Sequence, residues 1–195
     1  MVTLFFILFL LITLLMIAWV VRTLLHGRID RRTVATLDLA RYMGLWYEIA
    51  RLENRFELGM VAVTARYTLR DDGSIEVVNS GVSPRTHERH TAVGRAKTKG
   101  PGRLWVSFAG PFGSDYNILE LSPDYEWALV GGRSASYLWI LARHPELDAA
   151  TFELLKTKAQ QRGYDIEQLL TVDQSLHRAP DAPEEPQAPN EPARA

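Results

Sequence analysis

The 195-residue sequence contains no cysteine. This absence excludes disulfide bonds, thiolate nucleophiles, cysteine-based zinc sites and a lipid-modified cysteine at the N-terminus. It leaves the redox compartment open, because a chain of this length can bury a full hydrophobic core without disulfide bonds.

The net charge is also small, and histidines are few. The sequence has 22 basic and 23 acidic residues, a formal net charge of −1, and 5 histidines. It therefore lacks the positive field that draws proteins to nucleic acid. His87 and His90 lie three residues apart without a further ligand at zinc spacing, which favours a solvated loop pair over a metal site. We expect no nucleic-acid partner, no metal and no cofactor.

The first segment is a long apolar run. Residues 2–21 contain only Thr3 and Thr13 as polar residues. A helix of this length rises about 30 Å, the thickness of the hydrocarbon core of a membrane. A cleaved signal peptide is the alternative, but the run is long, no basic region precedes it and no small-x-small cleavage site follows. The sequence predicts a transmembrane anchor over residues 1–24.

The predicted linker over residues 25–37 is basic. Arg22, Arg28, Arg31 and Arg32 all follow the apolar run, and no basic residue precedes it. Taken alone, this charge bias would place the following domain in the cytoplasm.

At the other end, residues 175–195 read as a proline-rich tail. Its prolines fall at every third position from Pro180 to Pro192, which places them on one edge of a polyproline II helix. Residues 178–195 have no aromatic or β-branched residue with which to build a core. We expect a disordered, solvated tail.

Between these ends, residues 38–174 show short alternating runs separated by turn signals, typical of an antiparallel all-β domain. Asp72-Gly73 is a strong hairpin signal between the second and third runs. The predicted strands are Trp46–Leu52, Val61–Leu69, Ile75–Gly81, Thr91–Lys97, Arg103–Ala109, Tyr116–Leu121, Trp127–Gly131 and Tyr137–Arg143, with a short ninth at Leu169–Val172.

One amphipathic helix follows the eighth strand. Asp148 is a suitable N-cap, Phe152, Leu155 and Ala159 share one face, and Gly163 ends the helix. The outer wall of the sheet is the available partner for that apolar face.

Three motifs sharpen this interpretation. Gly44-Leu45-Trp46 opens the first strand, Asp124-Tyr125 precedes the seventh, and Arg143 ends the eighth. In this order and spacing they resemble the three conserved regions of the lipocalin family. The stretches from Trp46 to Arg51 and from Tyr137 to Leu141 resemble the bacterial outer-membrane lipocalins and apolipoprotein D.

The resemblance implies an all-β fold, an eight-stranded antiparallel up-and-down barrel with one C-terminal helix. A closed barrel of this size holds one small ligand if one end is sealed. Gly44 allows a tight turn into the first strand, Trp46 fills the floor, and the Arg143 guanidinium can stack on that ring. We expect Gly44, Trp46, Asp124, Tyr125 and Arg143 to have structural roles.

Strand alternation assigns candidate ligand contacts to the barrel lumen. Val106, Phe108, Tyr116 and Trp139 are predicted to face inward, beside the small residues Gly94 and Ala96. The resemblance makes residues 53–61 the lid over the open end, where Phe56 and Met60 would extend the apolar wall and Arg55 could meet an anionic head group.

An apolar lumen with a polar rim suits an elongated ligand with a charged head. The resemblance implies a carrier of a fatty acid or lysophospholipid, tethered to a membrane. An interaction protein with an incidental barrel is the first alternative. An enzyme is the second, supported only by Glu48, which could face inward without a catalytic partner. We expect no enzymatic activity. Because exported relatives work between membranes, we predict an inner-membrane anchor with the domain in the periplasm, against the arginine bias.

Overall fold

The computed structural model describes residues 9–17 and 29–177. The chain divides into two compact units between Asp30 and Arg31. In the first unit, residues 9–17 are helical, and the rest of the predicted membrane helix lies outside the described residues, as does the tail from residue 178. Within the described ranges, no helix is long and apolar enough to cross a membrane.

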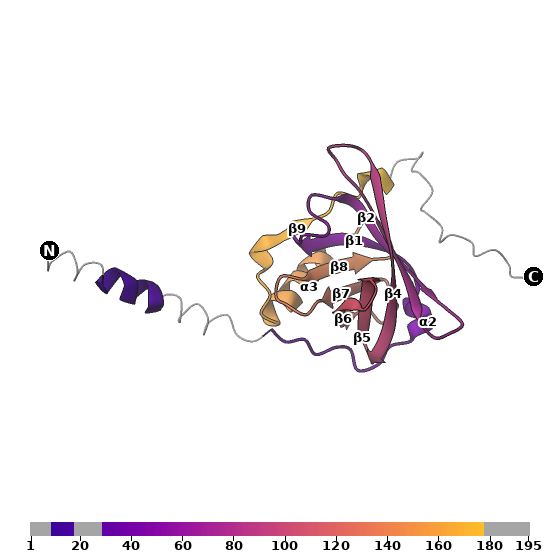
Figure 1. Cartoon of the computed structure of the whole chain (residues 1–195), viewed down its shortest axis with the longest axis horizontal. Helices are drawn as coiled ribbons and strands as arrows, with labels where there is room; N and C mark the ends of the chain where they lie inside the picture. Colours follow the sequence, from indigo (N-terminus) through magenta and orange to yellow (C-terminus); the bar gives the residue numbers. More distant parts are fainter. Residues whose placement is uncertain (1–8, 18–28, 178–195) are drawn as a thin grey trace, which may run out of the picture. The chain divides into compact units, whose positions relative to one another are not determined.

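The second unit is a β-barrel with one long helix (Figure 1). Its helices are α2 (Leu39–Tyr42) and α3 (Ala149–Gln161), with 3-10 turns η1 (Ile166–Gln168) and η2 (Ser175–His177). Its strands are β1 (Gly44–Leu52), β2 (Val61–Leu69), β3 (Ile75–Val82), β4 (Arg89–Gly100), β5 (Arg103–Ala109), β6 (Phe112–Leu121), β7 (Trp127–Gly131), β8 (Leu138–Ala142) and β9 (Leu169–Thr171).

Strands β1 to β8 form a closed antiparallel ring. Each pairs with the next in sequence, and β8 returns to pair with β1. This arrangement confirms the predicted eight-stranded barrel followed by one helix. Closure leaves none of these eight strands as a fully open edge, which is how such barrels avoid exposed pairing groups.

Strand β1 divides one of its edges between two partners. Residues Gly44 to Tyr47 pair with β2, whereas Ala50 to Leu52 pair with β9. Where β2 departs from β1, the buried Gln174 side chain donates hydrogen bonds to the carbonyls of Glu48 (2.7 Å) and Val63 (2.9 Å). The C-terminal segment of the domain therefore completes the wall.

A β-bulge in β1 changes which residues face inward. The pairing with β8 shifts between Glu48 and Ala50, so that Glu48 lies opposite Leu141 and Arg51 lies opposite Trp139. Since a bulge adds one residue to one strand, both Glu48 and Arg51 point to the same face.

Helix α3 covers part of the outer wall. Asp148 caps it by accepting a hydrogen bond from the Thr151 backbone N–H, as predicted from the sequence. Leu155 and Ala159 are fully buried. Near the end of the helix, Arg162 donates to the Leu119 carbonyl and to the Glu120 carboxylate of β6.

Candidate functional site

The inner face of the barrel is buried near one end and exposed near the other. On β4, Ala96 is fully buried while Ala92, four residues earlier, is exposed. On β5, the exposed fraction rises from 1% at Leu104 to 45% at Phe108. We call the buried end the floor and the other the open end. This gradient describes a cup with an apolar inner wall.

The predicted ligand contacts divide between this inner wall and the rim of the cup. Val106, Tyr116 and Trp139 pack against the core cluster on the inner face. Phe108 lies over Gly94, where a Cβ would come within 2.7 Å of its ring. Phe56 is mostly exposed and Met60 half-buried, both in the β1–β2 connection. The structure thus brings four of the six together inside the cup, and a ligand-binding role for all six stays a prediction.

Trp46 and Arg143 form the floor. The Trp46 ring is fully buried, with the Arg143 guanidinium carbon 3.8 Å from its centroid. Arg143 also donates to the carbonyls of Leu45 (2.8 Å) and Arg41 (2.7 Å). Gly44 has φ +94°, and a Cβ there would lie 3.4 Å from the Arg143 guanidinium. A side chain at Gly44 would therefore be strained by its backbone conformation, although its Cβ would only touch the cation.

Asp124 and Tyr125 hold the segment that leads into β1 against the floor. Tyr125 has φ +68°, and its hydroxyl accepts a hydrogen bond from the Asp38 backbone N–H at 2.8 Å. Arg41 stacks on the Tyr125 ring and donates to the Asp124 carbonyl. The Ser122 hydroxyl lowers the pKa of the Asp124 carboxyl by hydrogen bonding to it. These contacts attach the short helix α2 beneath the barrel.

Three tyrosine hydroxyls meet in the lumen above this floor. The Tyr42 and Tyr116 oxygens are 2.6 Å apart, and Tyr67 donates to Tyr116 at 3.0 Å. Burial raises the pKa of all three. Of these three, the sequence analysis predicts only Tyr116 to face the lumen. Tyr67 alternates correctly for an inward position on β2, whereas Tyr42 precedes the first strand and no strand pattern could have placed it there.

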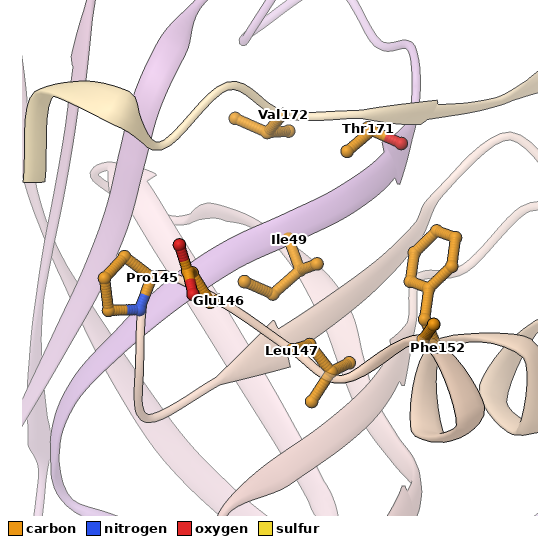
Figure 2. A pocket seen from close by; sticks show the side chains of 8 residues that line it. Ile49, Pro145, Glu146, Leu147, Phe152, Thr171 and Val172 are labelled. Atoms are coloured by element: carbon orange, nitrogen blue, oxygen red, sulfur yellow. The ribbon is translucent and has the colours of Figure 1, made fainter. Parts of the chain in front are cut away.

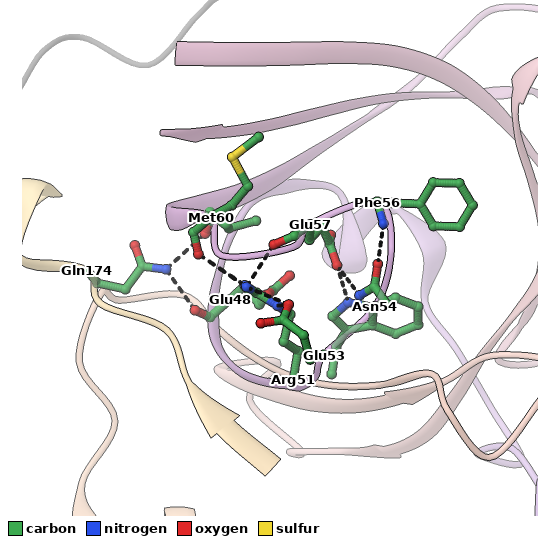
Figure 3. Close-up of polar contacts among 10 residues, drawn as sticks. Glu48, Arg51, Glu53, Asn54, Phe56, Glu57, Met60 and Gln174 are labelled. Carbon is green, nitrogen blue, oxygen red and sulfur yellow. Dashed lines mark hydrogen bonds and ion pairs between the residues drawn. The ribbon is translucent and has the colours of Figure 1, made fainter. Parts of the chain in front are cut away.

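Arg51 is the centre of a second polar group that our sequence analysis missed (Figure 3). Only 3% of the residue is exposed. Its guanidinium donates to the Glu48 carboxylate (3.0 Å) and the Glu53 carboxylate (3.1 Å). It also donates to the carbonyls of Glu57 (2.8 Å) and Met60 (3.2 Å). One buried cation therefore fastens the β1–β2 connection to the barrel wall.

Glu57 fastens the same connection to the neighbouring strand β8. Its carboxylate accepts from the Trp139 indole N–H at 3.0 Å and from the Asn54 side chain at 2.6 Å. Burial, and then the nearby charge of Glu57, raise the pKa of Glu48 well above its ordinary value, while Arg51 acts in the opposite direction. The inward position that we expected for Glu48 is observed, but its neighbour is a structural cation.

A pocket also lies outside the barrel, between β1, β9 and the segment leading into α3 (Figure 2). Its volume is about 370 Å³, and Ile49, Leu147, Phe152 and Val172 supply its apolar lining. None of the predicted ligand contacts belongs to it.

Comparisons with known proteins agree with this geometry. A family model described as a lipocalin-like domain matches residues 37–174. The chain belongs to the lipocalin family. Outer membrane lipoprotein Blc of Escherichia coli K12 is 42% identical to this lipocalin over 144 residues, covering 72% of the chain and 81% of the relative. Mouse apolipoprotein D is 34% identical and covers 71% and 77%. The cockroach allergen Per a 4 has a TM-score of 0.61 at 21% identity, covering 74% and 94%, and shows the shared fold.

The predicted inner-membrane location with a single-helix anchor is wrong. The bacterial relatives, among them Blc of Vibrio cholerae at 38% identity, are outer membrane lipoproteins. The anchor is predicted from the length of residues 2–21 and from the lack of a basic region and a cleavage site beside them. Length matches a segment to the thickness of a bilayer, but it does not specify which membrane a protein serves.

Proposed function

We propose that this lipocalin binds a fatty acid or lysophospholipid in the lumen of its barrel and does not alter it chemically. The exposure gradient of the inner face carries the proposal, since it describes an apolar cup that is closed at the floor and accessible at the open end. Each methylene removed from water contributes about 0.8 kcal/mol, so an acyl chain supplies enough free energy for binding after ordering costs.

The polar groups of the lumen support an amphiphilic ligand over a purely apolar one. The Tyr42, Tyr67 and Tyr116 hydroxyls offer hydrogen bonds at the floor, and the charged groups around Arg51 lie near the open end. An acyl chain lying along Val106 and Phe108 would leave its head group among the polar side chains of the rim.

Native mass spectrometry of the delipidated protein tests this function. Mixing it with lysophosphatidylethanolamine or palmitate should give a one-to-one complex. Val106→Trp, which fills the lumen, should abolish the complex, whereas Val93→Trp should leave it intact because Val93 lies on the outer face of the adjacent strand. Absence of a complex with the unmodified protein, or equal binding by both variants, would contradict the proposal.

We further propose that the protein works in association with a membrane, since its relative Blc is an outer membrane lipoprotein. The chain has no cysteine, so this association cannot use a lipid on a cysteine side chain. In cell fractionation at physiological salt, the protein should sediment with membranes and be released by detergent. Recovery in the soluble fraction would contradict the proposal.

A further inference from the structure

The four connections at the open end form a continuous rim. Because the strands alternate in direction around the ring, every second connection lies at the same end. At the open end these are residues 53–60, 83–88, 110–111 and 132–137. Contacts join two of them directly: the Phe56 and Tyr137 rings lie 6.4 Å apart.

Large apolar side chains on this rim are exposed to solvent. The exposed fractions are 68% for Phe56, 73% for Leu58, 79% for Phe112 and 45% for Phe108. They come from the first and third connections and the strand ends beside them. Single exposed apolar residues are common, but several on one rim indicate a surface that meets an apolar partner.

Cations accompany these side chains. Arg55, Arg85 and Arg133 are all exposed, each on a different connection of the rim. The exposed acidic side chain on these connections is Glu88, since Glu53 and Glu57 are half-buried and bonded to Arg51, Asn54 or Trp139. Aromatic and aliphatic tips among arginines match the boundary between head groups and acyl chains in an anionic bilayer.

We infer that the rim docks the open end of the barrel onto an anionic lipid bilayer. Phe56, Leu58 and Phe112 enter the head-group region, and the three arginines contact lipid phosphates. The purpose of docking rests on the proposed lipid-binding function, because a ligand could then pass between bilayer and lumen without crossing water. Docking itself is a separate, measurable property.

The absence of cysteine makes a position-specific test direct. Phe112→Cys in the full chain is labelled with an environment-sensitive nitrobenzoxadiazole group and mixed with phosphatidylcholine vesicles, with or without phosphatidylglycerol. The control is Leu154→Cys, 46% exposed on α3 and away from the rim. Because the readout is local, it reports on the rim whatever else in the chain contacts the vesicle.

The label at position 112 should brighten and be quenched by spin-labelled lipid, more strongly on anionic vesicles, while the label at position 154 should not respond. Adding Arg133→Gln should weaken the anionic component about fivefold, the effect of one basic residue near such a surface. Equal responses at both positions, or none at position 112, would overturn the inference. Lysolipid binding in native mass spectrometry would then still stand, so the two proposals fail independently.

Discussion

Arg51 illustrates how much one side chain organises in this barrel. Its donors reach two carboxylates and two carbonyls, and three of these four acceptors belong to residues 53–60. The strand pattern could not reveal this role. With strict alternation, Trp46 and Glu48 face inward and Arg51 faces solvent, and the bulge reverses that assignment.

Arg51→Met should reduce the free energy of unfolding by about 3–5 kcal/mol at neutral pH, because it leaves the buried Glu48 carboxylate without its cation. Burial raises the pKa of Glu48, so the folded state holds its proton more tightly than the unfolded state does. The free energy that this pKa difference contributes to folding is fully present below the pKa of Glu48 in the unfolded chain. It is lost as the pH rises through the pKa of Glu48 in the folded protein.

The loss caused by Arg51→Met should therefore be smaller at about pH 5 than at about pH 8, measured by urea unfolding at each pH. The double variant Glu48→Gln/Arg51→Met is the control, and its loss should not depend on pH in this way. A pH-independent loss in the single variant would show that Glu48 does not respond to Arg51.

Trp46→Ala should cost roughly 3–5 kcal/mol, the usual penalty for emptying a buried aromatic site. The ring packs against Tyr42, with centroids 4.9 Å apart, and its N–H donates to the Tyr42 carbonyl. Chemical unfolding monitored by circular dichroism measures this. If the variant keeps full stability and loses only ligand, the structural role of Trp46 is contradicted.

At the scale of the elements, the turn that follows α3 packs closely against β7. A Cβ on Gly131 would collide with the Tyr164 hydroxyl and come within 2.9 Å of Leu119. Gly131→Ala should therefore destabilise the domain by about 1–3 kcal/mol, the usual cost of overpacking.

Tyr164→Phe, which removes the colliding oxygen, should recover part of that loss in the double variant. Thermal unfolding of the four proteins in this cycle measures the coupling. Strictly additive effects would mean that α3 and its following turn shift away from β7 without strain.

The limits of a strand could be predicted from the sequence where turn residues flank it. The predicted limits of β2, β5 and β7 match the structure. Strand β6 begins at Phe112, four residues before the predicted start. Gly113 and Ser114 are typical of turns, yet Ser114 pairs with Val106 at the open end. A Cβ on Gly113 would meet the Trp105 indole, so packing across strands decides what local propensity cannot.

The site was less predictable than the fold. Alternation predicts Val106, Tyr116 and Trp139 on the inner face, where the strand pairings around them are regular. Phe108 also lies over Gly94, although the pairing of β5 with β6 shifts between Val106 and Ala109. It could not place Tyr42, which enters the lumen from α2, or Arg51, which follows a bulge. Both depend on contacts between distant segments, which sequence periodicity does not contain.

For the molecule as a whole, the tyrosines buried in the barrel should lower the stability of the fold at high pH. Burial raises the pKa of Tyr42, Tyr67 and Tyr116 above their ordinary value of 10.0. The unfolded chain loses these protons first, so stability is full below about pH 10 and falls as pH rises further.

In an ultraviolet titration, at least three of the seven tyrosines should ionise only as the barrel unfolds, giving a step that coincides with loss of near-ultraviolet circular dichroism. Tyr67→Phe should remove one tyrosine from that step. Smooth ionisation of all seven while the barrel stays folded would contradict the buried cluster.

The position of Gln174 affects when the domain can finish folding during its synthesis. Its side chain completes the wall by bonding to the carbonyl of Glu48, 126 positions earlier in the chain. The Asp173 carbonyl also accepts from the Ala62 backbone N–H, and the Val172 N–H donates to Ile49. A nascent chain still attached to the ribosome can pair β1 to β8 in order, but it cannot complete its wall until residues 172–174 leave the exit tunnel. Final closure of this barrel is therefore an event that follows almost the entire synthesis of the domain.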